Sequence, residues 1–268
     1  MTDTPSRNAL LDYLVTSRIA GRVATPRENN LDHFRRMSKR QPLYLFGLRP
    51  TGPWTPAEVL ALMVDRCGVS PDVRHVRGDD TIDPERTVER LEAMAALVRD
   101  AARQQQRVLL ATGHPHGVMS IHRALAQALR TAGCPLLSAA AGWQHPDEPS
   151  YRSPHRSIRF LDDVAVLTDS SGRPKHTHSP LPMVAILNAL ESAGEPLPEL
   201  VIGDHGWAGA AAQAGIATVG FADCNDPALF VGEAEGRVRV CVPLDDNLDP
   251  GLYAPLTAYL LHHAGLAG

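Results

Sequence analysis

From Arg107 onward, segments with the pattern of buried strands alternate with segments that have the spacing of helices. Short runs of Val, Leu and Ile predict strands, and apolar residues three or four positions apart predict helices. This alternation restricts the fold to βαβ units, in which right-handed helical crossovers join parallel strands. We therefore expect an α/β fold with a three-layer, Rossmann-like, mainly parallel sheet. The expected strands are residues 108–112, 135–139, 164–168, 199–204, 217–223 and 237–244, and the expected helices are 118–132, 183–193, 206–215 and 253–263, with a short helix between the last two strands.

The first 104 residues have a different pattern from the rest of the chain. Their apolar positions predict helices that begin at good capping residues, separated by a polar and basic stretch. We expect residues 1–104 to form a helical cap or extension that packs across a core of residues 105–268. The expected elements are helices over residues 6–20, from Thr55 and over residues 84–105, and a short strand over residues 41–48.

Composition and charge exclude several classes of partner. Of the 268 residues, 44% are apolar and 21% are charged, as in ordinary globular domains, and the formal net charge is −4. Nucleic-acid binding needs a concentrated basic face, which a chain of this charge does not indicate. No apolar run approaches the roughly 18 residues of a membrane span, and the first residues lack the layout of a signal peptide. We expect a cytoplasmic protein without membrane contact, and a homodimer is the assembly left open.

The loop ATGHPHG, residues 111–117, ends the first strand of the expected core and leads directly into a helix. Open parallel sheets bind ligands at this place, where free backbone N–H groups and the positive end of the helix attract phosphate. The loop is neither G-x-G-x-x-G nor a Walker loop, so the nucleotide-binding motifs are absent. We expect Gly113 and Gly117 to bind phosphate, and His114 and His116 to act as catalytic residues.

Polar clusters follow three further strands, and parallel topology brings all of these loops to one edge of the sheet. One of them contains His176 and His178, which point to the same side if the segment is extended. Histidine titrates near neutral pH and binds transition metals. The pair suits either a phosphate pocket, which we favour, or a metal such as Zn²⁺. Histidines expected to be merely surface residues of loops are His122, His145, His155, His262 and His263.

The segment from Gly203 to Asp226 carries the second set of candidate residues. Carboxylate and amide oxygens at neighbouring strand ends suit a hard divalent cation, so Mg²⁺ or Mn²⁺ is favoured, with Zn²⁺ possible because of the histidine. We interpret Asp226 as the N-cap of the helix that starts at Pro227. Asp245 and Asp246 form a weaker acidic pair, which could reach the same edge of the sheet, although a solvated loop explains them equally well. The expected metal ligands are Asp204, His205, Asp223 and Asn225.

The polar stretch RVATPRENN near the N-terminus offers planar donors that suit phosphate or carboxylate. A cap that carried these groups could close over the site and exclude water. A solvated linker between helices explains the same residues about as well. The candidate phosphate-binding residues are Arg22, Arg27, Asn29 and Asn30.

Several covalent mechanisms lack their sequence signature. There is no G-x-S-x-G nucleophile elbow, and the first core strand is not followed by the Asp motif of phospho-aspartyl enzymes. The four cysteines, Cys67, Cys134, Cys224 and Cys241, are far apart and have no C-x-x-C spacing. We therefore expect four free, buried thiols rather than a zinc knuckle, a disulfide scaffold or a nucleophile.

Strings along most of the chain resemble those of one protein family. They are TPRENN, ATGHPHG, HTHSPLPM, DHGWAG, GFADCNDPALFVGEAEG and VPLDDN, and they extend from about residue 18 to residue 265. The chain resembles a family of actinobacterial proteins described broadly as phosphatases. The resemblance implies hydrolysis of phosphomonoesters, without a particular substrate and without roles for single residues.

These patterns together predict a metal-dependent phosphatase that acts on a small phosphorylated metabolite, such as a sugar or nucleoside phosphate. The absence of a covalent nucleophile favours attack by a metal-activated water. Two alternatives remain open. A sugar-phosphate isomerase or lyase would use the histidines for acid–base chemistry, and a non-catalytic module would only bind a phosphorylated metabolite.

Overall fold

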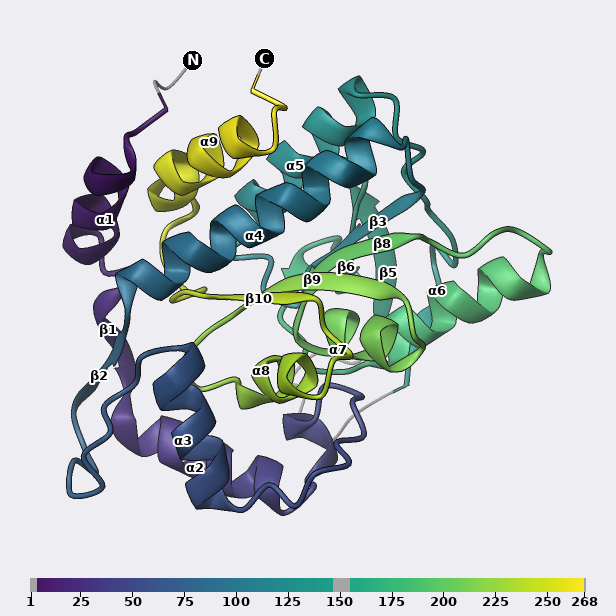
Figure 1. Cartoon of the computed structure of the whole chain (residues 1–268). Helices are drawn as coiled ribbons and strands as arrows, with labels where there is room; N and C mark the ends of the chain where they lie inside the picture. The colour runs from purple at the N-terminus through teal and green to yellow at the C-terminus, as the bar shows by residue number, and fades with distance from the viewer. Residues whose placement is uncertain (1–3, 147–154, 268) are drawn as a thin grey trace.

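The computed structural model describes residues 4–146 and 155–267, which form a mixed α/β fold around a mostly parallel sheet (Figure 1). The strand order is β10-β9-β8-β3-β6-β5-β4, and β7 pairs with β6. The neighbours from β10 to β6 are parallel, whereas β5, β4 and β7 pair antiparallel at one edge. The strands are β3 (Val108–Ala111), β4 (Gln144–His145), β5 (Arg156–Leu161), β6 (Val164–Thr168), β7 (Pro174–Lys175), β8 (Leu200–Asp204), β9 (Ala217–Ala222) and β10 (Val240–Pro243).

Helices cover both faces of this sheet (Figure 1). Successive residues of a strand point to opposite faces, so a strand buried on both sides needs apolar residues at every position. In β3, Val108 and Leu110 join one core cluster, while Leu109 and Ala111 join the other. One face carries α4 (Pro84–Arg103), α5 (Met119–Thr131) and α9 (Ala254–His263, after the 3₁₀ turn Pro250–Tyr253), and the other carries α6 (Leu181–Ser192), α7 (His205–Gln213) and α8 (Pro227–Ala234).

The N-terminal residues form the expected helices together with a small sheet that the sequence did not predict. Ser6 caps the first helix and Asp83 caps α4, while Thr55 and Glu58 form a reciprocal capping box, as the capping residues predicted. The new elements are the antiparallel strands β1 and β2 and helix α2. Their bounds are α1 (Arg7–Thr16), β1 (Gly21–Pro26), α2 (Arg27–Ser38), α3 (Pro56–Arg66) and β2 (Asp79–Ile82).

Helix α4 packs against β10 and α9, so it belongs to a helical layer of the central sheet. Val88, Leu91 and Val98 are fully buried in the core cluster that also contains residues of β3 and β10. The hydroxyl of Thr87 donates to the carbonyl of Pro243 at 2.8 Å. The boundary at residue 104 and the action of the N-terminal residues as a cap stay predictions.

Three local predictions were wrong. Residues 41–48 form a 3₁₀ turn (Pro42–Tyr44) and a reversal with positive φ at Phe46 and Gly47, not a strand. Residues 135–139 contribute only one bridge, from Leu136 to Val108, because β6 and β8 occupy the edges of β3 beyond it. Strand β5 was missed, because no strand was expected between residues 139 and 164. Its turn to β6, Asp162-Asp163, has positive φ at both residues, which is the geometry of a two-residue hairpin.

The strand order places a topological switch point between β3 and β8. From β3 the chain crosses through α5 toward β6, whereas from β8 it crosses through α7 toward β9 on the other side. Loops that leave in opposite directions open a crevice at the carboxyl ends of the two strands.

All four cysteines are buried and free, as expected. In the described part of the chain, no helix has the length and apolar character needed to cross a membrane.

Candidate functional site

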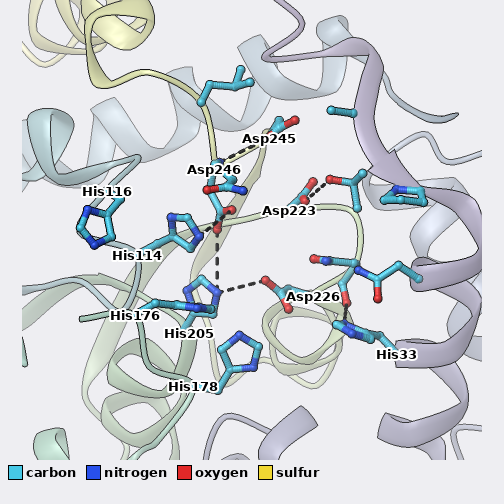
Figure 2. A pocket seen from close by; sticks show the side chains of 17 residues that line it. His33, His114, His116, His176, His178, His205, Asp223, Asp226, Asp245 and Asp246 are labelled. Atoms are coloured by element: carbon cyan, nitrogen blue, oxygen red, sulfur yellow. Dashed lines mark hydrogen bonds and ion pairs between the residues drawn. The ribbon is translucent and has the colours of Figure 1, made fainter. Parts of the chain in front are cut away.

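A cavity of about 520 Å³ lies at the carboxyl ends of the parallel strands (Figure 2). Loops after β3, β7, β8, β9 and β10 form most of it, and β1 with α2 closes one side. Its residues come from segments far apart in the sequence, as the expected convergence of strand-end loops requires. The titratable residues that line it are His33, His114, His116, His176, His178, His205, Asp223, Asp226, Asp245 and Asp246.

Four imidazole rings form one cluster in this cavity (Figure 2). The ring centroid of His176 lies 4.7 Å from that of His114 and 4.8 Å from that of His178, and His178 lies 4.8 Å from His205. Loss of hydration, with the nearby charge of His205, lowers the pKa of His114 and of His178 to about 4 and that of the more exposed His176 to about 2. These three rings are therefore neutral near pH 7 and have lone pairs to offer.

His205 is held between carboxylates on both of its ring nitrogens. Its Nδ1 lies 2.9 Å from Asp204 Oδ1, and its Nε2 lies 3.2 Å from Asp226 Oδ2 and 3.9 Å from Asp246 Oδ2. Burial opposes protonation, but Asp226 and Asp204 outweigh it and raise the pKa of His205 well above its usual value. Because a carboxylate only accepts hydrogen bonds, Asp204 holds a proton on Nδ1 and Asp226 holds one on Nε2, the nitrogen that faces the cavity.

The opposite side of the cavity is acidic and almost closed to solvent. Asp223, Asp226, Asp245 and Asp246 are each at most 5% exposed. Burial and the charge of Asp245 raise the pKa of Asp223 to about 7, and burial raises that of Asp246 well above its usual value. Only Asp226, which faces His205, has a lowered pKa despite its burial. Clustered carboxylates of this kind are unfavourable unless a cation balances them.

The donor atoms of this cavity suit a divalent metal ion. Three sets of side chains have ligand atoms within 4.8 Å of one another. Among the described residues, buried atoms without a hydrogen-bond partner include Asp246 Oδ2, His114 Nδ1 and His178 Nδ1. Buried polar atoms are normally paired, so a ligand bound in this cavity could supply their partner. The sets are His176, His178 and His205; His205, Asp226 and Asp246; and Asp223, Asp245 and Asp246.

Comparison of the sequence with known proteins covers nearly the whole chain, including all the residues of the cavity. A family model described as Phosphatase matches residues 5–268. The chain belongs to this Phosphatase family. A phosphatase of Streptomyces coelicolor is 51% identical to it over 265 residues, which cover 98% of each of the two chains. The resemblance drawn from the sequence strings is thereby confirmed.

Two of the residues expected to bind metal, Asp223 and Asp204, differ in whether they reach the cavity. Asp223 reaches the cavity, where its Oδ2 accepts from the hydroxyl of Thr25 at 2.5 Å. Asp204 is fully buried behind His205 and does not line the cavity. It accepts from the backbone N–H of Gly113 at 2.6 Å as well as from His205, so it orients this histidine.

The structure refines one interpretation of an acidic residue and decides another that was left open. Asp226 is the N-cap residue of α8, as expected, but it makes no side-chain cap hydrogen bond, because its carboxylate faces His205 instead. Asp245 and Asp246 are buried in the cavity rather than solvated. Asn225 lines the cavity, and its backbone carbonyl lies 2.9 Å from His33 Nδ1.

The residues expected to bind phosphate are mostly engaged elsewhere. The N–H of Gly113 donates to Asp204, and the N–H of Gly117 donates to the carbonyl of His114 at 3.2 Å. Arg22 is exposed and pairs with Asp79, whereas Arg27 and Asn30 are fully buried around Asp80. Asn29 alone of the four polar candidates lines the cavity.

Sequence reasoning missed Thr25 and His33, both of which line the cavity. Asn29 and His33 are four residues apart on α2, so they lie on the same face of the helix. This four-residue spacing from Asn29 was the signal in the sequence that could have identified His33. The four catalytic candidates His114, His116, His176 and His178 all line the cavity, with His116 exposed at its edge (Figure 2).

His122 was expected to be a surface residue of a loop, but it is fully buried in α5 behind the cavity. Its Nε2 lies 3.5 Å from Asp204 Oδ2, on the far side of the carboxylate that holds His205. It does not line the cavity and supports the site from outside.

Proposed function

We propose that this protein hydrolyses phosphate monoesters of a small metabolite with the help of a divalent metal ion bound in the cavity. The observation that carries the proposal is the convergence of four imidazoles and four buried carboxylates in one cavity of about 520 Å³. Membership of the Phosphatase family supports the reaction class. A cavity of this volume suits a small metabolite.

The side chains divide into metal-holding and phosphate-facing groups. Asp223, Asp245 and Asp246 would hold the ion, with His205 beside them. When bound, the ion would supply a Lewis acid for the phosphoryl group and a water of lowered pKa. Asp204 keeps the proton of His205 on Nδ1, so that Nε2 remains directed at the cavity.

The remaining groups suit the phosphate and the leaving oxygen. The ring of His114 lies beside the carboxylates, with its Nε2 3.9 Å from Asp246 Oδ1. As a neutral imidazole it can donate one N–H hydrogen bond to a phosphoryl or leaving-group oxygen. His116 at the cavity edge and the side-chain amides of Asn29 and Asn225 offer further contacts to the substrate.

A thiol nucleophile does not fit this site. Cys224 is the cysteine nearest in sequence to the carboxylates, but it is fully buried. Burial raises the pKa of its thiol well above its usual value, and Asp223 raises it further. The thiolate that nucleophilic catalysis needs is therefore disfavoured.

Purified protein is expected to release inorganic phosphate from members of a panel of sugar and nucleoside phosphates when Mn²⁺ or Mg²⁺ is present. Removal of metal with excess EDTA should abolish release, and added Mn²⁺ should restore it. Full activity in protein shown by elemental analysis to be metal-free would contradict the metal requirement. Products that retain their phosphate would indicate the isomerase or lyase, and binding without turnover would indicate the non-catalytic module.

Gly117→Ala is expected to lower kcat/KM for phosphate release by roughly 100-fold, because misplacement of reacting groups by about 1 Å can have this effect. A Cβ atom at Gly117 would lie 1.7 Å from the carbonyl oxygen of Asp246, so the loop that carries this carboxylate must move. The control is Gly251→Ala, whose nearest contact is a side-chain oxygen of Asp249 at 3.1 Å. Equal kcat/KM in the two folded variants would show that the position of Asp246 does not matter.

A further inference from the structure

We infer that the cavity binds two divalent cations at adjacent positions of different chemistry. The imidazole position consists of His176, His178 and His205, and the carboxylate position consists of Asp223, Asp245 and Asp246. The inference rests on the proposed function, because it concerns the same cavity. It replaces the phosphate-pocket interpretation of His176 and His178 favoured from the sequence.

The imidazole position is held rigidly by contacts behind the rings. The backbone N–H of Thr177 donates to the carbonyl of Gly113 at 2.9 Å, which ties the segment to the loop after β3. The ring of Phe46 packs edge-on against His178, at 5.1 Å between centroids, and lies equally close to His205. His178 is therefore held by the backbone of Thr177 on one side and by the ring of Phe46 on the other. Its Nδ1 is buried and has no hydrogen-bond partner among the described groups.

His205 has the arrangement of a metal-binding histidine. Ligating imidazoles usually donate their second N–H to a carboxylate, which orients the ring and makes it a better donor. Here Asp204 accepts that hydrogen bond at Nδ1, while Nε2 faces the cavity beside Asp226, and a bound ion would take the place of the Nε2 proton. Nitrogen donors favour ions such as Zn²⁺, whereas oxygen donors favour Mg²⁺ or Mn²⁺.

The carboxylate position has His205 beside it but too few compensating charges for the four carboxylates of the cavity. Among the described residues that line the cavity there is no Lys or Arg, although four carboxylates meet there. Asp246 is 4% exposed, and its Oδ2 has no hydrogen-bond partner among the described groups. Buried charges need a partner or a metal ion. A hard divalent cation among Asp223, Asp245 and Asp246 supplies it.

The third set of donors lies between the two positions. His205, Asp226 and Asp246 have ligand atoms within 4.8 Å of one another, and His205 and Asp246 each belong also to one of the outer sets. The two ions would therefore be neighbours that share these side chains. Two-metal hydrolases hold their ions about 3.5–4 Å apart, which lets both ions contact one phosphoryl group.

The test is the number of Mn²⁺ ions bound per chain, measured by equilibrium dialysis and elemental analysis of metal-free protein. Wild type should bind two ions that give the electron paramagnetic resonance signal of a coupled pair. His178→Ala and, independently, His176→Asn should each bind one ion with an uncoupled signal, as should Asp245→Asn. His116→Ala is the matched control, because this histidine lines the cavity but belongs to none of the three sets.

A second measurement separates the two positions by their chemistry. Asp204→Asn should weaken Zn²⁺ binding at the imidazole position by about 10–100-fold, the usual effect of losing a partner of a ligating histidine. It should leave Mn²⁺ binding at the carboxylate position unchanged. Circular dichroism and thermal unfolding confirm that each variant is folded.

A single Mn²⁺ ion in saturated wild type would overturn the inference. Retention of both ions by folded His178→Ala and His176→Asn, or loss of both ions in every variant, would also overturn it. Failure of the proposed function looks different. Wild type that binds two coupled ions but releases no phosphate would leave the two-metal centre standing, and hydrolysis with one bound ion would contradict only the second position.

Discussion

Asp246→Asn is expected to abolish most phosphate release and, at the same time, to raise the melting temperature of the metal-free protein. Loss of even an indirect partner of a metal ligand costs about 10–100-fold in affinity or activity, so loss of a ligand shared by two donor sets should lower kcat/KM by at least about 100-fold. The two effects have opposite signs because the same charge serves function and opposes folding.

The gain in stability follows from the position of the Asp246 carboxylate. Burial raises its pKa well above the usual value, and the charges of Asp223 and Asp226 raise it further, against the opposing effect of His205. A carboxyl whose pKa is higher in the folded state than in the unfolded state costs stability at neutral pH. Asparagine keeps the shape and removes the charge. The expected gain is about 1–2 kcal/mol, or roughly 3 °C per kcal/mol for a chain of this size.

The measurement compares kcat/KM of wild type and Asp246→Asn in the presence of Mn²⁺, and the melting temperatures of both metal-free proteins in EDTA. Asp249→Asn is the matched control, because this exposed residue of the same loop caps a 3₁₀ turn through Gly251 and asparagine caps equally well. It should change neither quantity. Asp246→Asn with wild-type activity, or with a lower metal-free melting temperature, would contradict the assigned role.

Arg27→Met is expected to lower the free energy of unfolding by about 3–5 kcal/mol, the usual cost of breaking a buried ion pair. Arg27 and Asp80 are both fully buried, and Arg27 Nη1 lies 2.8 Å from Asp80 Oδ2. Arg27 Nε also donates to the carbonyl of His75 at 3.0 Å. Without Arg27 the Asp80 charge stays buried, with only the side chain of Asn30 and backbone N–H groups to bind it.

Urea-induced unfolding measures this effect, with Arg22→Met as the control. Arg22 also pairs with an aspartate of β2, since its Nε lies 2.8 Å from Asp79 Oδ2, but its side chain is 79% exposed. Exposed pairs contribute only about 0–1 kcal/mol. Similar losses in the two variants would show that the buried pair does not stabilise the N-terminal segment.

The effect of Arg27→Met should also shrink in acid. Burial opposes ionisation of Asp80, but the N–H of Ser70 and the Arg27 guanidinium outweigh it and lower the pKa. A carboxyl with a lowered folded-state pKa stabilises the fold above its unfolded pKa, near 3.9, and this contribution is lost as the pH falls through the folded-state value. The difference between wild type and variant should therefore be largest near pH 7 and smaller at about pH 3.

Local patterns in the sequence were sufficient to predict the architecture that positions the site. Five of the six expected core strands are confirmed as β3, β6, β8, β9 and β10. Parallel topology then requires their carboxyl ends to share one edge, so the meeting of His114, His176 and His205 followed without coordinates. The strand predicted at 135–139 failed because apolar character does not say whether a neighbouring edge is free.

The partners of the charged residues were decided only by the tertiary structure. Asp226 reads as a helix cap from its position before a proline, yet it faces His205. Arg27 reads as a phosphate ligand, yet it is buried against a residue 53 positions away, and Thr25 meets Asp223 across 198 positions. Whether a charge is solvated, paired or held for a metal depends on burial and on distant neighbours, and helix or strand periodicity encodes neither.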